Sequence, residues 1–151
     1  MSLNYDVIIV GGGNAGFGVS AIVHEAGKKI AFIEERDFGG TCPNRGCTPK
    51  KVLVAAAHAL HEIEIANTHC INVGKPTLDW TRLIQREKDV VSFIPDAMAG
   101  VTEKRGDVFR GSAQFVGPNS VEVNGEVLEG ENIVIATGSK PVLYPFLALN
   151  T

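Results

Sequence analysis

The stretch that decides the fold is residues 5–16, which read YDVIIVGGGNAG. Its first half, Tyr5–Val10, is apolar, rich in β-branched side chains and bounded by glycine, and therefore predicts a buried strand. The glycine turn that follows predicts a helix over about residues 15–26, ended by Gly27. A second buried strand is expected over residues 29–33. Together these elements predict a β-α-β unit with two parallel strands and a right-handed crossover.

The glycine turn has the pattern GxGxxG, and each glycine in it has a physical reason. Gly11 allows the tight turn, Gly13 lets a pyrophosphate approach the backbone, and Gly16 lets the helix pack closely on the strand. The free N–H groups and the positive dipole end of the helix then face the phosphates. Glu34 closes the second strand, where its carboxylate can accept hydrogen bonds from a ribose. We therefore expect a dinucleotide to contact Glu34 and the whole turn, namely Gly11, Gly12, Gly13, Asn14, Ala15 and Gly16.

A cysteine pair carries the predicted chemistry, within residues 39–51, which read GGTCPNRGCTPKK. Residues 38–46 are rich in Gly, Pro and Asn and are expected to form a loop. This loop can fold Cys42 back onto Cys47. Because Cys47 lies just before a predicted helix start, we expect the helix dipole to favour its thiolate. A dithiol of this kind can be oxidised and reduced without a large movement of the scaffold.

The remaining elements complete an α/β fold. A helix is expected from Thr48, which can cap it with Pro49 in the first turn, to about residue 66. A further helical stretch covers residues 79–104, with Pro95 as a candidate break. The tail from Pro141 has no clear element. Short strands are expected over residues 108–110, 112–116, 120–123, 126–128 and 132–135, which we interpret as a small antiparallel meander that returns to the parallel sheet.

Other interpretations of these motifs were open. The glycine turn could lack a ligand, and on its own it does not separate FAD from NAD. Cys42 and Cys47 could be unreactive structural thiols. Zinc sites favour shorter cysteine spacings and four ligands, and an iron–sulfur site needs two more cysteines, whereas Cys70 is the only other one in the sequence. We therefore predict no metal site, and we interpret Cys70 as a small buried residue.

Composition and charge exclude several classes of function. The 151 residues amount to about one domain, and the formal net charge is −3. Lys and Arg are scattered, so no nucleic-acid partner is expected. The apolar runs are too short to cross a membrane and the N-terminus lacks the regions of a secretory signal, so we predict a cytoplasmic protein with no membrane partner.

These motifs together resemble the class I pyridine nucleotide–disulfide oxidoreductases, a family that includes glutathione reductase, dihydrolipoamide dehydrogenase and mercuric reductase. Residues 39–51 are similar to the active-site signature of that family. Residues 135–141, IATGSKP, resemble its second flavin-contacting segment. The resemblance covers essentially the whole chain. It implies a Rossmann-like FAD-binding domain over residues 1–151, incomplete relative to the family.

The resemblance also implies roles for single residues. Cys47 would be the charge-transfer thiol beside the flavin, and Cys42 the interchange thiol that attacks a small-molecule disulfide substrate. Lys50 would lie near the flavin N5 edge. NADPH or NADH would reduce FAD, which would then reduce the dithiol. Besides the glycine turn and Glu34, the residues expected to contact FAD are Gly40, Thr41, Lys50, Ala113, Ala136, Thr137 and Gly138.

The chain departs from the family in length. Family members add an NAD(P)-binding domain and a dimer-interface domain that supplies a catalytic His to the other subunit. We therefore expect a truncated chain without turnover of its own, from a protein that forms a homodimer at full length. Lys50 and Lys51 after Pro49 favour the glutathione reductase branch, whereas Ala21 stands where glutathione reductases carry a basic residue. A dihydrolipoamide dehydrogenase-like enzyme, a non-catalytic FAD-binding module and a plain NAD-binding Rossmann domain are the alternatives.

Overall fold

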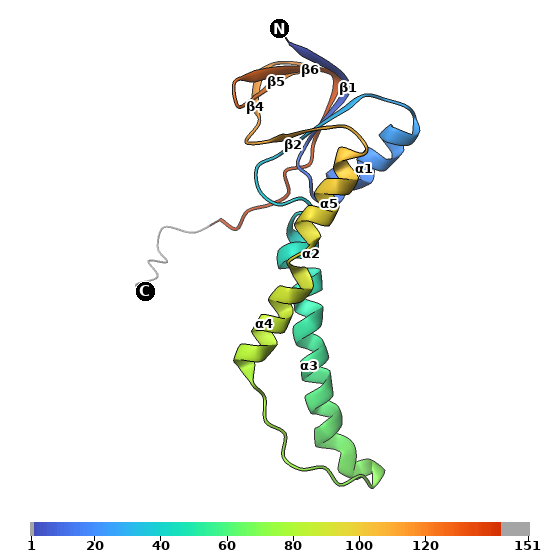
Figure 1. The fold of residues 1–151 in the computed structure, drawn as a ribbon, viewed down its shortest axis with the longest axis vertical. Coiled ribbons are helices and arrows are strands. Elements are labelled where there is room, and N and C mark those ends of the chain that lie inside the picture. The colour runs from blue at the N-terminus through green and yellow to red at the C-terminus, as the bar shows by residue number, and fades with distance from the viewer. Residues whose placement is uncertain (1, 143–151) are drawn as a thin grey trace, which may run out of the picture.

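The predicted β-α-β unit forms the centre of the fold (Figure 1). In the computed structural model, which describes residues 2–142, β1 (Leu3–Val10) and β2 (Ile30–Glu34) are parallel neighbours joined by α1 (Asn14–Glu25). Gly27 stops the helix as predicted: it follows the C-cap residue Ala26, and its φ of +70° lies in the left-handed region that favours glycine. The Gly27 N–H donates to the carbonyl of His24 and so satisfies one of the last groups of the helix.

Within residues 2–142 the strands form one sheet in the order β3-β2-β1-β6-β5-β4. The four remaining strands are β3 (Asp107–Arg110), β4 (Gln114–Gly117), β5 (Ser120–Val123) and β6 (Glu126–Ile135). The pairs β3–β2, β2–β1 and β1–β6 are parallel. The pairs β4–β5 and β5–β6 are antiparallel, and they confirm the predicted meander. The mixed α/β fold is therefore the one that the sequence predicts.

Two details of the meander prediction are wrong. The strand expected over residues 108–110 lies outside the meander, because β3 pairs in parallel with β2 and extends the sheet at the opposite edge. The strands expected over residues 126–128 and 132–135 are one continuous strand, β6. It pairs with β5 through its first residues and with β1 along most of its length, so it belongs to both halves of the sheet.

The helices differ from the predictions mainly around the cysteines. Residues 38–46, expected as a loop, contain the short helix α2 (Thr41–Arg45). Helix α3 (Cys47–Ile65) begins after Gly46, and Thr48 lies inside it without a capping hydrogen bond, so the prediction that Thr48 caps the helix is wrong. A 3-10 turn (Ala66–His69) follows, and it ends at Cys70, which is exposed with a φ of +60°. The prediction that Cys70 is buried is therefore wrong.

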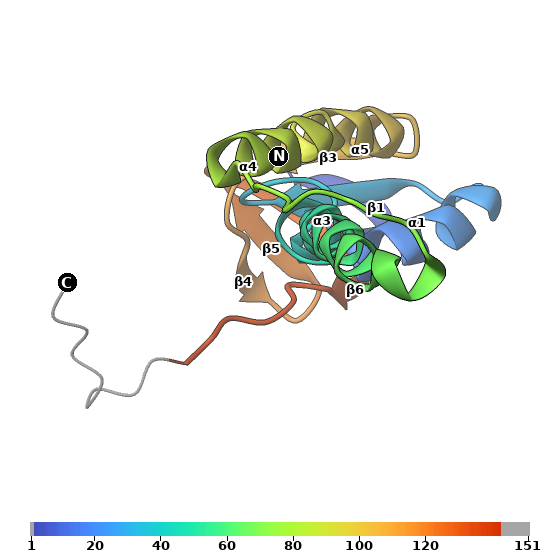
Figure 2. The same ribbon diagram turned by 90° about the horizontal axis from the view of Figure 1, so that it is seen from below.

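The break predicted near Pro95 is confirmed. The stretch divides into α4 (Trp80–Val91) and α5 (Ile94–Glu103), and Pro95 lies in the first turn of α5, where its missing N–H costs nothing. Helices α3 and α4 form a hairpin that extends away from the sheet in Figure 1. In Figure 2, α4 and α5 follow one another along one side of the molecule. No helix in residues 2–142 is long and apolar enough to cross a bilayer.

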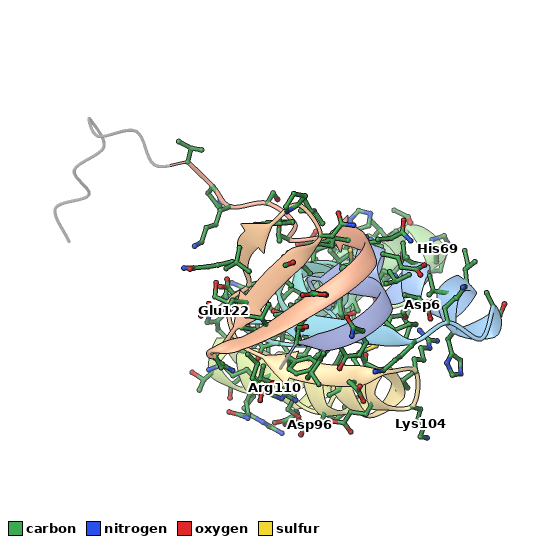
Figure 3. The ribbon with its side chains drawn as sticks, turned by 90° about the horizontal axis from the view of Figure 1, so that it is seen from above. Asp6, His69, Asp96, Lys104, Arg110 and Glu122 are labelled. Atoms are coloured by element: carbon green, nitrogen blue, oxygen red, sulfur yellow. The ribbon has the colours of Figure 1, made fainter. Side chains whose placement is uncertain are left out.

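The core lies on both faces of the sheet, because β1 and β2 are covered from two sides. On one face the side chains of β1 and β2 pack against Ala99 and Met98 of α5 and against Val19 and Val23 of α1. On the other face they pack against the meander, through buried side chains that include Val121. Figure 3 shows the two sides, with Asp96 and Lys104 marking the α5 layer and Glu122 marking the meander. This double covering holds the ends of the central strands in fixed positions.

Candidate functional site

A groove of about 870 Å³ borders the carboxyl ends of β1, β2 and β6. Ligands of open α/β sheets bind at this edge, and the volume lies within the roughly 300–1,000 Å³ typical of cofactor sites. The groove is lined by twelve of the predicted site residues: Gly11, Gly13, Asn14, Ala15, Glu34, Gly40, Thr41, Cys42, Ala113, Ala136, Thr137 and Gly138. Four others, Gly12, Gly16, Cys47 and Lys50, lie outside this lining.

The two outer glycines of the turn are required by close backbone approaches. Gly11 has a φ of +110°, and a Cβ built on it would lie 2.2 Å from the carbonyl oxygen of Ala136. A Cβ on Gly16 would lie 2.0 Å from the carbonyl oxygen of Gly11 and 2.9 Å from Cγ2 of Ile9. The packing reasons that the sequence suggests for both glycines are therefore confirmed. Gly16 allows the turn and the helix to pack closely, but it does not line the groove.

Gly12, the second residue of the turn, packs against a different part of the chain. Gly12 is buried, and a Cβ on it would lie 2.6 Å from the ring of Phe38. Its N–H donates to Oε2 of Glu34 at 2.7 Å, while Oε1 of Glu34 accepts from the N–H of Arg36 at 2.8 Å. The carboxylate that was expected to hold a ribose is thus itself held at the groove wall by two backbone donors. Each oxygen keeps a further lone pair for a ligand.

Gly13 is the one glycine of the turn that combines a place in the groove lining with free space for a side chain. A Cβ on it would meet nothing closer than Cα of Gly40, at 3.6 Å. Its backbone is extended, with φ of −81° and ψ of −171°, which any residue can adopt. A glycine here is therefore not required by the protein's own packing.

The glycine turn also contacts the segment that carries the cysteines. The Gly39 N–H donates to the carbonyl of Gly12 at 2.8 Å, and Gly13 and Gly39 form an isolated parallel bridge. Gly39 and Gly40 have positive φ angles, of +93° and +65°. Helix α2 starts directly after Gly40, so this contact places Thr41 and Cys42 at the wall of the groove.

The two cysteines lie side by side as free thiols, Cys42 half-buried and Cys47 exposed. Cys42 lies in α2 and Cys47 begins α3, and Gly46 is the one residue between the two helices. A Cβ on Gly46 would lie 3.4 Å from Cα of Cys42, so that position has little room for a side chain. Among the described residues, no three His, Cys, Asp or Glu side chains come together as a metal site.

The two thiols are not equivalent as acids. The pKa of Cys42 is lowered, chiefly by a hydrogen bond with the Cys47 side chain, and further by a hydrogen bond with Asn14 and by the charge of Lys51. The pKa of Cys47 is raised, chiefly by the same hydrogen bond, and further by desolvation and by the negative charge of Cys42. Cys42 is therefore the more acidic thiol of the pair. We expected the start of α3 to favour the Cys47 thiolate, whereas in this pair the pKa of Cys47 is raised, chiefly by its hydrogen bond with Cys42.

Sequence reasoning missed the charged side chains around the groove. They are Glu35, Arg36, Asp37, Arg45 and Lys140. Arg45 forms an ion pair with Asp37, which ties α2 to the segment after β2. The charged residues after β2 and β6 could have been predicted as site residues, because ligands bind at the carboxyl ends of parallel strands. Arg45 gave no such signal, because α2 itself was not predicted.

Comparisons with known proteins agree with this geometry. The family description "pyridine nucleotide-disulphide oxidoreductase" matches residues 5–149. The dihydrolipoyl dehydrogenase of Chlamydia muridarum is 34% identical over 149 residues, which cover 96% of this chain and 32% of the relative. The glutathione reductase of Burkholderia cepacia is 33% identical over 148 residues, covering 97% of this chain and 33% of the relative. The chain thus spans about a third of the length of these curated relatives.

Solved structures give the same result. The HOCl-induced flavoprotein disulfide reductase RclA from Escherichia coli is 32% identical, with a TM-score of 0.76 over 93% of this chain and 30% of that one. A Cu(II) complex of RclA has a TM-score of 0.74 at 31% identity, over 92% of this chain and 29% of the other. The sequence match, the shared fold and the paired cysteines beside the groove all lead to one conclusion. The protein belongs to the pyridine nucleotide-disulphide oxidoreductase family.

Proposed function

We propose that this chain is the FAD-binding part of a flavin-dependent disulfide oxidoreductase, with Cys42 and Cys47 as its redox-active dithiol. One observation carries the proposal. The groove lined by the glycine turn is also lined by Thr41 and Cys42, so a cofactor in the groove would lie beside the dithiol. A plain NAD-binding Rossmann domain has no need of a thiol pair at that place.

The residues present fit a dinucleotide with a flavin. Gly13 leaves room for phosphates beside the start of α1, and Glu34 offers carboxylate oxygens for a ribose. Thr41 adds a hydroxyl, while Ala136, Thr137 and Gly138 form the wall after β6. The remaining predicted contacts, including Lys50 and Ala113, belong to the same proposal. FAD, when bound, supplies the capacity to take electrons from NAD(P)H and to pass them to a disulfide.

The dithiol can perform disulfide exchange with its own groups. The Cys42 thiolate attacks one sulfur of a substrate disulfide, which forms a mixed disulfide and releases one substrate thiolate. Cys47, once its proton has left, attacks Cys42, which forms the Cys42–Cys47 disulfide and releases the second substrate thiolate. The pair loses two electrons to the substrate, and the two released thiolates become thiols by taking the proton of Cys47 and one proton from solvent. The lowered pKa of Cys42 suits the attacking role.

The full-length protein is proposed to use NAD(P)H and to act as a homodimer on a small-molecule disulfide, with residues 1–151 as the first part of its FAD-binding domain. Named relatives include both dihydrolipoyl dehydrogenases and a glutathione reductase. The Lys50-Lys51 run favours a glutathione reductase-related enzyme. Two adjacent cations on the first turns of α3 would attract an anionic disulfide toward the thiols.

FAD titration of this chain tests the proposal, with Gly13→Ala as the decisive variant. Because the protein has room for a Cβ at Gly13, the variant is expected to fold with unchanged stability. We expect its FAD affinity to fall by about tenfold or more, since the closest approach of the phosphates to the backbone is lost. Gly18→Ala is the matched control, because Gly18 lies in α1 with nothing within 4 Å of an added Cβ.

The outcomes separate the competing functions. FAD binding by the wild-type chain and by Gly18→Ala, with weak binding by Gly13→Ala and no comparable binding of NAD, supports the proposal. Tighter binding of NAD than of FAD would favour the plain NAD-binding domain. Equal FAD affinity in Gly13→Ala and in the wild type would contradict the placement of the cofactor in this groove.

A further inference from the structure

Asn14 stands between the glycine turn and the dithiol. It is the first residue of α1 and lines the groove, where the glycine pattern alone would make it a cofactor contact. Cys42 lines the same groove, and the Asn14 side chain lies near enough to that thiol to contribute to the lowered pKa of Cys42. Nothing in the spacing of the two motifs implies this contact, because the residues lie far apart in the sequence.

Backbone contacts fix the neighbourhood of these two side chains. The Gly39 N–H donates to the Gly12 carbonyl at 2.8 Å, and Gly13 and Gly39 form a bridge. A Cβ on Gly40 would lie 2.8 Å from Cα of Gly13, so the two chain segments touch where both helices begin. Gly13 is the N-cap of α1 and Gly40 is the N-cap of α2. The first residues of the two helices are therefore held against each other by backbone alone.

The charges around Cys42 come from several elements. Helix α2 contributes Arg45, whose charge is paired with Asp37 of the preceding segment. Helix α3 contributes Cys47, Lys50 and Lys51, and helix α5, which also contacts α2, carries Asp96 and Glu103. Asn14 is a neutral donor near Cys42, and it comes from the helix of the glycine turn. Its effect acts at contact distance and is therefore screened by salt far less than the charge of Lys51.

We propose that Asn14 is a positioning residue for Cys42: its amide donates a hydrogen bond to the sulfur and makes Cys42, rather than Cys47, the nucleophile of the pair. The placement of Asn14 beside Cys42 stands on the backbone contacts between the starts of α1 and α2 and on the groove that both residues line, while its use in disulfide exchange rests on the proposed function. The interaction gives the glycine turn a second function: the turn proposed to face the cofactor phosphates also sets the reactivity of the attacking thiol.

The test measures the rate of alkylation of Cys42 by iodoacetamide as a function of pH. The parent is the chain with Cys47→Ser and Cys70→Ser, so that Cys42 is the single reporter, and Asn14→Ala and Asn14→Asp are added to it. Asn67→Ala, an exposed asparagine in the 3-10 turn after α3, is the matched control. Because Asn14 is exposed and alanine is the better helix former, Asn14→Ala is expected to fold, which circular dichroism checks.

We expect Asn14→Ala to slow alkylation at pH 7 by about threefold to tenfold and to move the rate profile to higher pH, with the same limiting rate at high pH. The shift should persist at high salt. Asn14→Asp should move the profile further, because a carboxylate repels the thiolate, and Asn67→Ala should match the parent. An unchanged profile in Asn14→Ala, or a lower limiting rate, would overturn the inference, since the latter indicates altered access to the sulfur. FAD binding is measured separately. If the chain does not bind FAD but Asn14→Ala still moves the alkylation profile to higher pH, the proposed function is refuted and the role of Asn14 is supported.

Discussion

Two alanine substitutions in helix α1, at Gly16 and Gly18, should have opposite effects on stability. A Cβ on Gly16 would lie 2.0 Å from the carbonyl oxygen of Gly11, and backbone cannot yield as a flexible side chain can. Overpacking of this kind costs about 3 kcal/mol at the upper end of its usual range. Replacing glycine by alanine in a helix returns about 1 kcal/mol. The expected net destabilisation by Gly16→Ala is therefore about 2 kcal/mol.

Gly18 provides the comparison within the same helix. It is exposed, and an added Cβ would meet nothing within 4 Å, so Gly18→Ala should gain about 1 kcal/mol from helix propensity alone. Urea unfolding followed by circular dichroism measures both values. With a slope near 2 kcal/mol per molar urea, the two midpoints should differ by about 1.5 M. A Gly16→Ala variant as stable as Gly18→Ala would refute the conclusion that the turn and the helix are in closest contact at Gly16.

Two further predictions concern contacts that hold the sheet and its helices together. Burial raises the pKa of Tyr5, as does its hydrogen bond to Oδ2 of Asp107, so the folded state retains the phenolic proton longer than the unfolded state does. This contribution to stability is complete below the unfolded pKa of about 10 and is lost as the pH rises above it. The urea midpoints of the wild type should therefore fall more steeply between about pH 10 and 12 than those of Tyr5→Phe. Equal slopes in the two proteins would contradict this. Arg105 donates to the carbonyl of Phe17 at 3.1 Å and to Oγ of the buried Ser20 at 2.9 Å, so Arg105→Ala should lose about 2 kcal/mol of unfolding free energy. Arg105→Lys should recover less than half of that loss in the same urea experiment, because an ammonium cannot reproduce the planar fork, and full recovery would show that charge alone matters.

Local sequence patterns were sufficient to predict the part of the fold around the glycine turn. The strand Tyr5–Val10, the turn and the helix after it are adjacent in sequence, so their hydrophobic period and their glycines predict both the elements and their packing. Gly16 confirms this, since the residues it contacts, Gly11 and Ile9, lie within the same β-α-β unit. The placement of Ala136 against Gly11 follows from the same topology, because β6 is the parallel neighbour of β1.

The neighbourhood of the cysteines could not be predicted in the same way. Helix α2 has five residues, too few for a hydrophobic period, and it contains Pro43. It is held by tertiary contacts, among them the bond from Nδ2 of Asn44 to the carbonyl of Phe38 and the bridge between Gly13 and Gly39. The order of acidity of the two thiols depends chiefly on the contact between Cys42 and Cys47, which an argument from the start of α3 alone does not include. Strand β3 was misplaced for a similar reason, because its pairing with β2 joins segments far apart in the chain.

The central claim is that a flavin bound in the groove lies against the dithiol, and the visible absorbance of FAD-loaded Cys42→Ser and Cys47→Ser chains tests it most directly. Removing Cys42 removes the chief cause of the raised pKa of Cys47, so the Cys47 thiolate should form on moderate alkalinisation. We predict that Cys42→Ser then shows the long-wavelength band of a thiolate beside an oxidised flavin, that Cys70→Ser does not prevent this band when added, and that Cys47→Ser lacks it. A Cys42→Ser chain that binds FAD but shows no band at any pH would contradict the account.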